Sequence, residues 1–223
     1  MLGLRRRGDL KTKREALLVH CIRESRAILT SVGVIARPRA ADALRLAQRR
    51  FLAPERIDMG VLADELDVNR VTLYRWFGSR DDFLVEVVWS LTLRAFNYVK
   101  EKVSAQGAER VVAIVIGFLD TVITNPGLQR WLGEEREHAM RLLTSPETNF
   151  QRRLIDALQG LLEEEANASR LDLPVDLHEL AYVIVRVIES YIYFDLITGE
   201  RPELERAAER VEPILRMLLR TEA

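Results

Sequence analysis

Almost every segment of the chain has the period of an α-helix, and none alternates apolar and polar residues as a strand does. In the segment AADALRLAQRRFLA, for example, Ala43, Ala47 and Phe51 share one stripe. Pro54 then ends that helix. With only 11 Gly and 7 Pro among 223 residues, collagen-like and low-complexity classes are excluded. The sequence therefore predicts an all-α fold.

No uncharged apolar run is long enough to span a bilayer, and the first residues lack an apolar signal core with a cleavage site. The single cysteine, Cys21, cannot form a disulfide within the chain and excludes a cysteine-based zinc site. These features predict a protein of the reducing cytoplasm.

The net charge of −1 hides an uneven distribution. The basic extension, residues 1–39, carries ten Arg and Lys against three acids, whereas residues 102–223 carry fourteen basic and twenty-one acidic residues. A basic front favours a polyanionic partner, although a solvated tail without a partner fits the same numbers. Such an extension is either an arm that grips a polyanion or the product of a wrongly chosen start codon.

Two short helices are expected in close succession, at Asp58–Leu66 and Asn69–Phe77, with Gly78 as the stop. Two short helices joined by a tight bend are typical of a helix-turn-helix. Apolar residues needed where the helices cross are present as Leu62, Ala63, Val68 and Leu73. A capping-box pattern at 79–82 then opens a long helix that we expect to reach about residue 101.

The second of these helices offers short polar groups at its N-terminal end, where a helix enters the major groove. Asn69, Arg70 and Thr72 suit base edges, because Asn pairs with adenine, Arg pairs with guanine, and Thr contacts a thymine methyl or a phosphate. Tyr74, Arg75 and Arg80 suit backbone phosphates. The full set of predicted DNA contacts is Asp58, Met59, Gly60, Asn69, Arg70, Val71, Thr72, Tyr74, Arg75 and Arg80.

The stretch LADELDVNRVTLYRWFGSRDDFLVEVV resembles the signature of the TetR family of bacterial transcriptional regulators, and the upstream Ala43, Ala47 and Phe51 match it too. The resemblance covers about residues 40–90. It implies three parts: the extension at 1–39, a DNA-binding domain at 40–90, and an effector-binding and dimerisation domain at 91–223. The segment YIYFDLITGERPELERAAERVEPILRMLL is similar to the terminal helix pair of regulators grouped with a lactonase-operon repressor.

Some positions depart from the family pattern. The turn has Asp67 where Gly is usual, but Asp tolerates a left-handed backbone, so the bend is expected to survive. Val71, Trp76 and Arg80 also differ from the commoner residues, which leaves the operator sequence open.

The resemblance implies a cytoplasmic homodimer that binds double-stranded operator DNA and a small-molecule effector, without a membrane partner or a cofactor. The interface is expected at helices 175–198 and 203–220, because residues 180–197 are apolar nearly all round, and a charge at Ile188 or Ile192 is expected to disturb it. An apolar or amphipathic effector, such as a lactone or an acyl compound, is expected. The candidate effector residues are Asp120, Thr121, Thr124, Trp131, His138, Tyr182, Arg186 and Glu189.

Two other classes of function are open alternatives. Glu135 and His138 have the Glu-x-x-His spacing of helical di-iron enzymes, but the motif occurs once and the other histidines are His20 and His178. No recognisable nucleophile elbow is present, so no catalytic residue is assigned. A helical adaptor or ligand-binding protein without operator binding is the other alternative.

Overall fold

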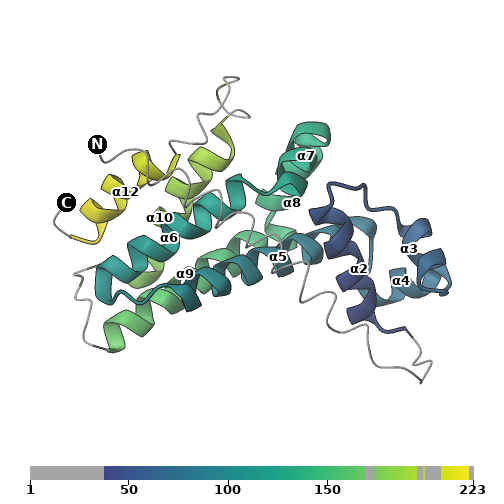
Figure 1. Ribbon diagram of the computed structural model, residues 1–223, viewed down its shortest axis with the longest axis horizontal. Coiled ribbons are helices and arrows are strands. Elements are labelled where there is room, and N and C mark those ends of the chain that lie inside the picture. Colours follow the sequence, from purple (N-terminus) through teal and green to yellow (C-terminus); the bar gives the residue numbers. More distant parts are fainter. Residues whose placement is uncertain (1–37, 169–172, 174, 195–197, 199–206, 221–223) are drawn as a thin grey trace, which may run out of the picture. The chain divides into compact units, whose positions relative to one another are not determined.

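The computed structural model describes residues 38–168, 173, 175–194, 198 and 207–220 (Figure 1). All regular structure in these ranges is helical, which confirms the all-α prediction. Cys21 and nearly all of the basic extension lie outside the described residues. The chain divides into two compact units between Arg80 and Asp81, ten residues before the expected end of the DNA-binding domain.

In the described part of the N-terminal unit, residues 38–80, three helices pack together: α2 (Ala40–Leu52), α3 (Met59–Glu65) and α4 (Arg70–Phe77). Each lies within one or two residues of its expected range. At the crossing of α3 and α4, Leu62 and Leu73 are fully buried and Ala63 is nearly so. The spacing of small and apolar residues therefore fixes how these helices pack.

The turn between α3 and α4 has the left-handed backbone that the sequence predicted. Asp67 has a φ of 51°, and the amide of Val68 donates to the carbonyl of Ala63 over 3.0 Å. At the other end of α4, Gly78 has a φ of 81° and its amide donates to the carbonyl of Tyr74. A side chain is strained at such a φ, so glycine suits this stop.

The longest of the described helices, α5 (Arg80–Lys102), begins with the last residue of the N-terminal unit and otherwise belongs to the C-terminal unit. The C-terminal unit continues with α6 (Gly107–Ile123), α7 (Pro126–Glu134), α8 (Arg136–Thr144), the 3-10 turn η1 (Pro146–Thr148), α9 (Phe150–Asn167), α10 (Leu177–Ile192) and α12 (Ala207–Leu218).

Asn125 and Pro126 follow the end of α6 and start the next helix. The Asn125 side chain accepts a hydrogen bond from the amide of Leu128 over 2.9 Å, and Pro126 occupies the first turn of α7. Proline suits that position because its missing N–H has no partner there anyway. Helices α7 and α8 then meet at Glu135.

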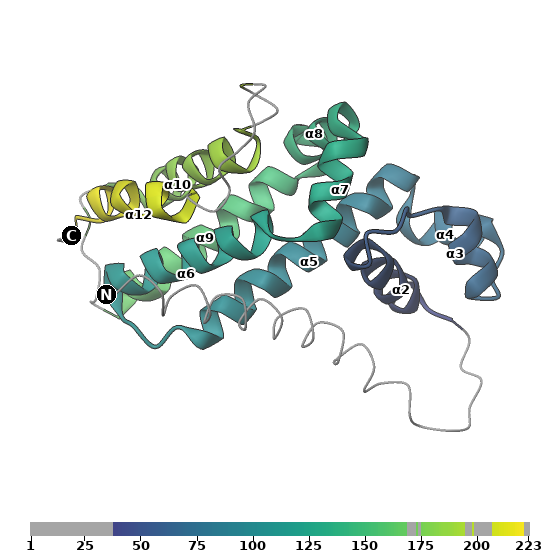
Figure 2. The same ribbon diagram turned by 45° about the horizontal axis from the view of Figure 1, so that its top comes forward.

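The core of the C-terminal unit lies where α6 packs against α9, α10 and α12 (Figures 1 and 2). Ile114, Leu161, Ile184 and Leu215 are fully buried there. At one end of this core the buried Glu165 accepts hydrogen bonds from the amide of Gly107 and from Arg110. The end of α9 thereby holds the start of α6.

Helix α10 has a buried inner side and an outer side that exposes apolar residues. Its inner side, including Ile188 at 3% exposure, is buried in the core of its own subunit. Its outer side exposes Tyr182 (44%) and Val183 (39%). Ile188 is therefore a core residue, and the expectation that it lies at an interface is wrong.

None of the described helices, taken singly, is long and apolar enough to cross a membrane. The pair α6 and α7 meets the requirement only together and is bent by 58°.

Candidate functional site

Helix α4 separates its residues into an inner and an outer side. Leu73 is fully buried, while Arg70, Val71, Tyr74 and Arg75 are exposed, Val71 at 70%. Because the Val71 side chain is exposed, it contributes little burial free energy to the fold. The outer side of α4 is therefore the strongest candidate for contact with another molecule.

Asn69 begins α4. Its side-chain oxygen accepts a hydrogen bond from the amide of Val71 over 2.8 Å, as an N-cap residue does. The bidentate pairing of Asn with adenine needs that same oxygen together with the amide nitrogen. In this structure the Asn69 oxygen therefore caps the helix, and the base contact predicted for Asn69 stays a prediction.

Arg70 and Tyr74 contact each other along the outer side of α4. The Nη2 of Arg70 donates to the hydroxyl of Tyr74 over 2.8 Å, and the guanidinium carbon lies 5.4 Å from the ring centroid. The two residues are four apart in sequence, so one turn of helix places them together.

The start of α3 is occupied by its own cap. The Asp58 carboxylate accepts hydrogen bonds from the amides of Val61 and Gly60, and these bonds hold the pKa of Asp58 below its ordinary value. Met59 is buried at 2% exposure. The side chains of Asp58 and Met59 thus have roles within the unit, and the amide of Gly60 donates to the Asp58 carboxylate.

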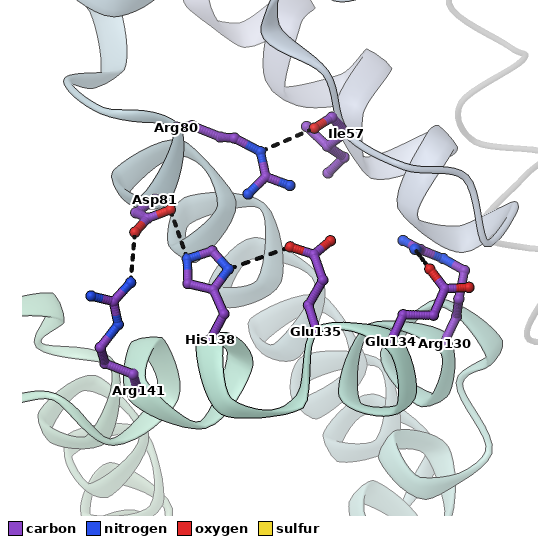
Figure 3. Close-up of polar contacts among 8 residues, drawn as sticks. All are labelled: Ile57, Arg80, Asp81, Arg130, Glu134, Glu135, His138 and Arg141. Atoms are coloured by element: carbon purple, nitrogen blue, oxygen red, sulfur yellow. Dashed lines mark hydrogen bonds and ion pairs between the residues drawn. The ribbon is translucent and has the colours of Figure 1, made fainter.

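Arg80 and Thr72 are both half-buried. Arg80 donates from Nε to the carbonyl of Ile57 over 3.3 Å, which ties it to the residue just before the α3 cap (Figure 3). Thr72 donates its amide to the carbonyl of Asn69. Of the ten predicted contacts, the structure places Arg70, Val71, Tyr74 and Arg75 together on one exposed surface.

In the C-terminal unit, three polar side chains from α9 and α10 form a cluster. Gln151 donates to the Glu189 carboxylate and to the carbonyl of Leu143, while Arg186 donates to the Gln151 oxygen and lies 2.9 Å from Glu189. Burial raises the pKa of Glu189, and the hydrogen bond from Gln151 and the charge of Arg186 oppose that shift. Two of the predicted effector residues, Arg186 and Glu189, are thereby brought together.

Gln151 itself was not among the predicted residues. It lies 35 and 38 residues from its two charged partners, on a helix whose stripe gives no sign of them. Tyr182 stacks on Arg186 with 5.1 Å between the guanidinium carbon and the ring centroid, but its own ring is on the exposed side of α10.

His138 belongs to a separate set of contacts on α8. Its Nε2 lies 2.9 Å from the Asp81 carboxylate and its Nδ1 lies 3.4 Å from Glu135, while Arg141 approaches the second oxygen of Asp81 (Figure 3). The Glu-x-x-His spacing therefore places these two side chains against each other on one helix. Within the described ranges, no group of three or more His, Cys, Asp or Glu side chains is arranged to hold a metal ion.

The remaining effector candidates lie elsewhere. Thr121 and Thr124 donate to carbonyls of α6 itself, Asp120 is half-buried on that helix, and Trp131 is buried in α7. A hollow of about 610 Å³ in this unit contains none of the eight candidates. Its lining residues are Val103, Ser104, Ala105, Gln106, Arg110, Glu164, Glu165 and Asn167.

Comparisons with known proteins agree with this architecture. The chain is similar in structure to the transcriptional repressor QsdR of R. erythropolis, from the TetR family, with a TM-score of 0.71 and 26% identity over 82% of this chain and 95% of that one. A second solved structure, the TetR family transcriptional regulator PfmR of Thermus thermophilus, aligns with a TM-score of 0.40. The two sequences are 17% identical over 81% of this chain and 98% of that one. No curated protein matches the sequence.

A family model described as the tetracyclin repressor-like C-terminal domain matches residues 106–220, which is more than half of the chain. This match lies in the C-terminal unit, whereas the helix-turn-helix residues lie in the N-terminal unit. Two separate parts of the molecule thus lead to the same conclusion, that the chain belongs to the TetR family of transcriptional regulators.

Proposed function

We propose that this regulator is a dimeric repressor that binds operator DNA through α4 and leaves it when a small apolar or amphipathic effector binds the C-terminal unit. Regulators of the TetR family bind operator DNA as dimers and bind ligands, and they are generally not enzymes. The proposal places the protein in the cytoplasm and gives it no cofactor.

The outer side of α4 is the observation that carries the DNA-binding part. Arg70 in the first turn suits a base edge, Val71 beside it suits a thymine methyl, and Arg75 in the last turn suits a phosphate. The eight arginines and six acids of residues 38–80 give this unit a net positive charge. Arg80 remains a proposed phosphate contact.

The first test is selection of a binding sequence from random duplexes, followed by titrations at several salt concentrations. Arg75→Ala is expected to weaken binding to every sequence and to lower the slope of log K against log salt by about one unit per subunit. Arg152→Ala, which removes the same charge from an exposed position on α9, is the matched control and should leave the slope unchanged. Equal slopes for wild type and Arg75→Ala would remove Arg75 from the interface.

The proposed dimer interface lies on the outer sides of α10 and α12. Tyr182, Val183 and Met217 are exposed there, Met217 at 70%. Two such helices from each subunit would form a four-helix interface, and stable obligate interfaces bury on the order of 2,000 Å² or more. A monomer at micromolar concentration in light scattering would rule this interface out.

The effector part rests on the apolar core between α6, α9 and α10, with the Gln151, Arg186 and Glu189 cluster as its polar group. Linkage requires that operator DNA weaken effector binding by the factor by which effector weakens operator binding. Calorimetry with a medium-chain acyl lactone, with and without the selected duplex, measures both factors. Equal lactone affinity in the two titrations would exclude induction by this compound class.

A further inference from the structure

The contact between Arg70 and Tyr74 has a consequence for sequence recognition. Both side chains are exposed, and they are joined by a hydrogen bond and a cation–π contact. An exposed arginine ordinarily samples many rotamers, and ordering it on a ligand costs side-chain entropy. Here the two contacts with Tyr74 order the arginine side chain before any ligand arrives.

The chemistry of the pair leaves the arginine able to bind. A guanidinium has five N–H donors, and the Tyr74 hydroxyl takes one from Nη2. Four donors remain, which is enough for the two parallel hydrogen bonds that arginine makes to O6 and N7 of guanine. Since the Tyr74 hydroxyl accepts from Arg70, its own hydrogen is still available to a phosphate oxygen.

The position on the helix selects Arg70 as the base reader. Residues in the first turn of a recognition helix contact base edges, and Arg70 is the first residue of α4. The neighbouring Asn69 uses its oxygen on the amide of Val71. Arg75 lies more than one turn further along the helix.

We propose that Tyr74 is a positioning residue that holds Arg70 in place to read one guanine in each half-site. The proposal rests on the proposed DNA-binding function of α4. It differs from a simple phosphate role for Tyr74, because a phosphate contact strengthens binding to all sequences equally, whereas a positioning contact changes the preference for one base.

The experiment uses the full chain and the duplex that wild type selects from random sequences. Dissociation constants are measured for this duplex and for duplexes in which each guanine is replaced in turn. The variants are Arg70→Ala, Tyr74→Phe and the double variant, with Arg75→Ala as the control for a phosphate contact. Phenylalanine keeps the ring of this exposed residue and removes only the hydroxyl, so the fold is preserved, which circular dichroism verifies.

Arg70→Ala is expected to reduce discrimination at one guanine per half-site by about 5- to 150-fold. Tyr74→Phe should reduce discrimination at the same guanine by about 3- to 10-fold, as expected for one hydrogen bond, and should have no further effect on it in the Arg70→Ala background. Arg75→Ala should weaken all duplexes alike.

Two results would overturn the inference. In the first, Tyr74→Phe weakens all duplexes by one common factor and does so equally in the Arg70→Ala background, which makes Tyr74 a phosphate ligand. In the second, Arg70→Ala changes no base preference. Failure of the DNA-binding function itself looks different, because wild type would then select no sequence at all.

Discussion

The outer side of α4 and the polar clusters of the C-terminal unit differ in how far apart along the chain the partners lie. On α4 the side chain of Asn69 accepts from an amide two residues ahead, and Arg70 donates to a side chain four residues ahead. In the C-terminal unit Gln151 and Arg186 are 35 residues apart, and His138 and Asp81 are 57 apart. The contacts along α4 are thus local, whereas these clusters join distant parts of the chain.

This difference explains which inferences a sequence permits. A cap, a tight turn and an i, i+4 pair are set by residue types at fixed short spacing, so they are visible in the sequence. A polar cluster between α9 and α10 depends on how two helices pack, and that depends on many apolar residues at once. The following changes test whether the contrast holds.

The largest effect is expected from a charge placed in the apolar core of the C-terminal unit. Ile188→Glu should lower the free energy of unfolding by about 3–5 kcal/mol, because Ile188 is 3% exposed among apolar residues. Val183→Glu, on the outer side of α10, should instead keep the fold and yield monomers. Denaturant titration and light scattering separate the two outcomes. A folded, fully stable Ile188→Glu monomer would place Ile188 at the interface after all.

The second effect concerns the polar cluster. Gln151→Leu should cost about 1–3 kcal/mol, since it leaves the Leu143 carbonyl and the Glu189 carboxylate each without the donor that Gln151 supplies. Gln159→Leu on the same helix, whose hydrogen bonds are exposed, is the control and should stay within about 0.5 kcal/mol. Equal losses in urea denaturation would show that the cluster contributes nothing special.

The same cluster predicts a pH dependence. Burial raises the pKa of Glu189 above its ordinary value of 4.5, so the folded state holds the proton to higher pH than the unfolded state. The contribution of this group to stability is therefore greatest below pH 4.5 and falls as the pH rises through the folded pKa. Glu189→Gln should abolish this fall, which unfolding free energies across that window would reveal.

How much the sequence could predict follows the same division. The bounds of α3 and α4, the left-handed Asp67 and the stop at Gly78 were all predictable, because each depends on a few neighbouring residues. The contact between Arg186 and Gln151 was not, because Gln151 lies on another helix, 35 residues away along the chain.

The third effect uses two glycines of the C-terminal unit. A Cβ on Gly117 would lie 2.8 Å from Cγ1 of Val99, so Gly117→Ala should cost about 1–3 kcal/mol and Val99→Ala should recover part of that loss. A Cβ on Gly160, inside α9, would meet nothing within 4 Å, so Gly160→Ala should gain about 0.5–1 kcal/mol from helix propensity. Thermal melts of Gly117→Ala and Gly160→Ala compare a contact between two helices with a local helix propensity. The first variant should lower the melting temperature and the second should raise it.

The smallest loss of stability is expected at the N-cap of α4, in the N-terminal unit. Asn69→Ala should cost about 1 kcal/mol, because the amide of Val71 loses its cap, and Asn69→Ser should restore most of that stability. From sequence alone, Asn69 was expected to choose among bases, whereas a capping role predicts that Asn69→Ala weakens all duplexes alike through a less stable α4. Thermal melts and selected sequences of the two variants distinguish these roles. Asn69→Ala could instead change the preferred bases and leave the melting temperature unchanged. In that case the Asn69 side chain would release the amide of Val71 when DNA binds and would contact a base. The hydrogen bond to Val71 would then describe only the DNA-free protein.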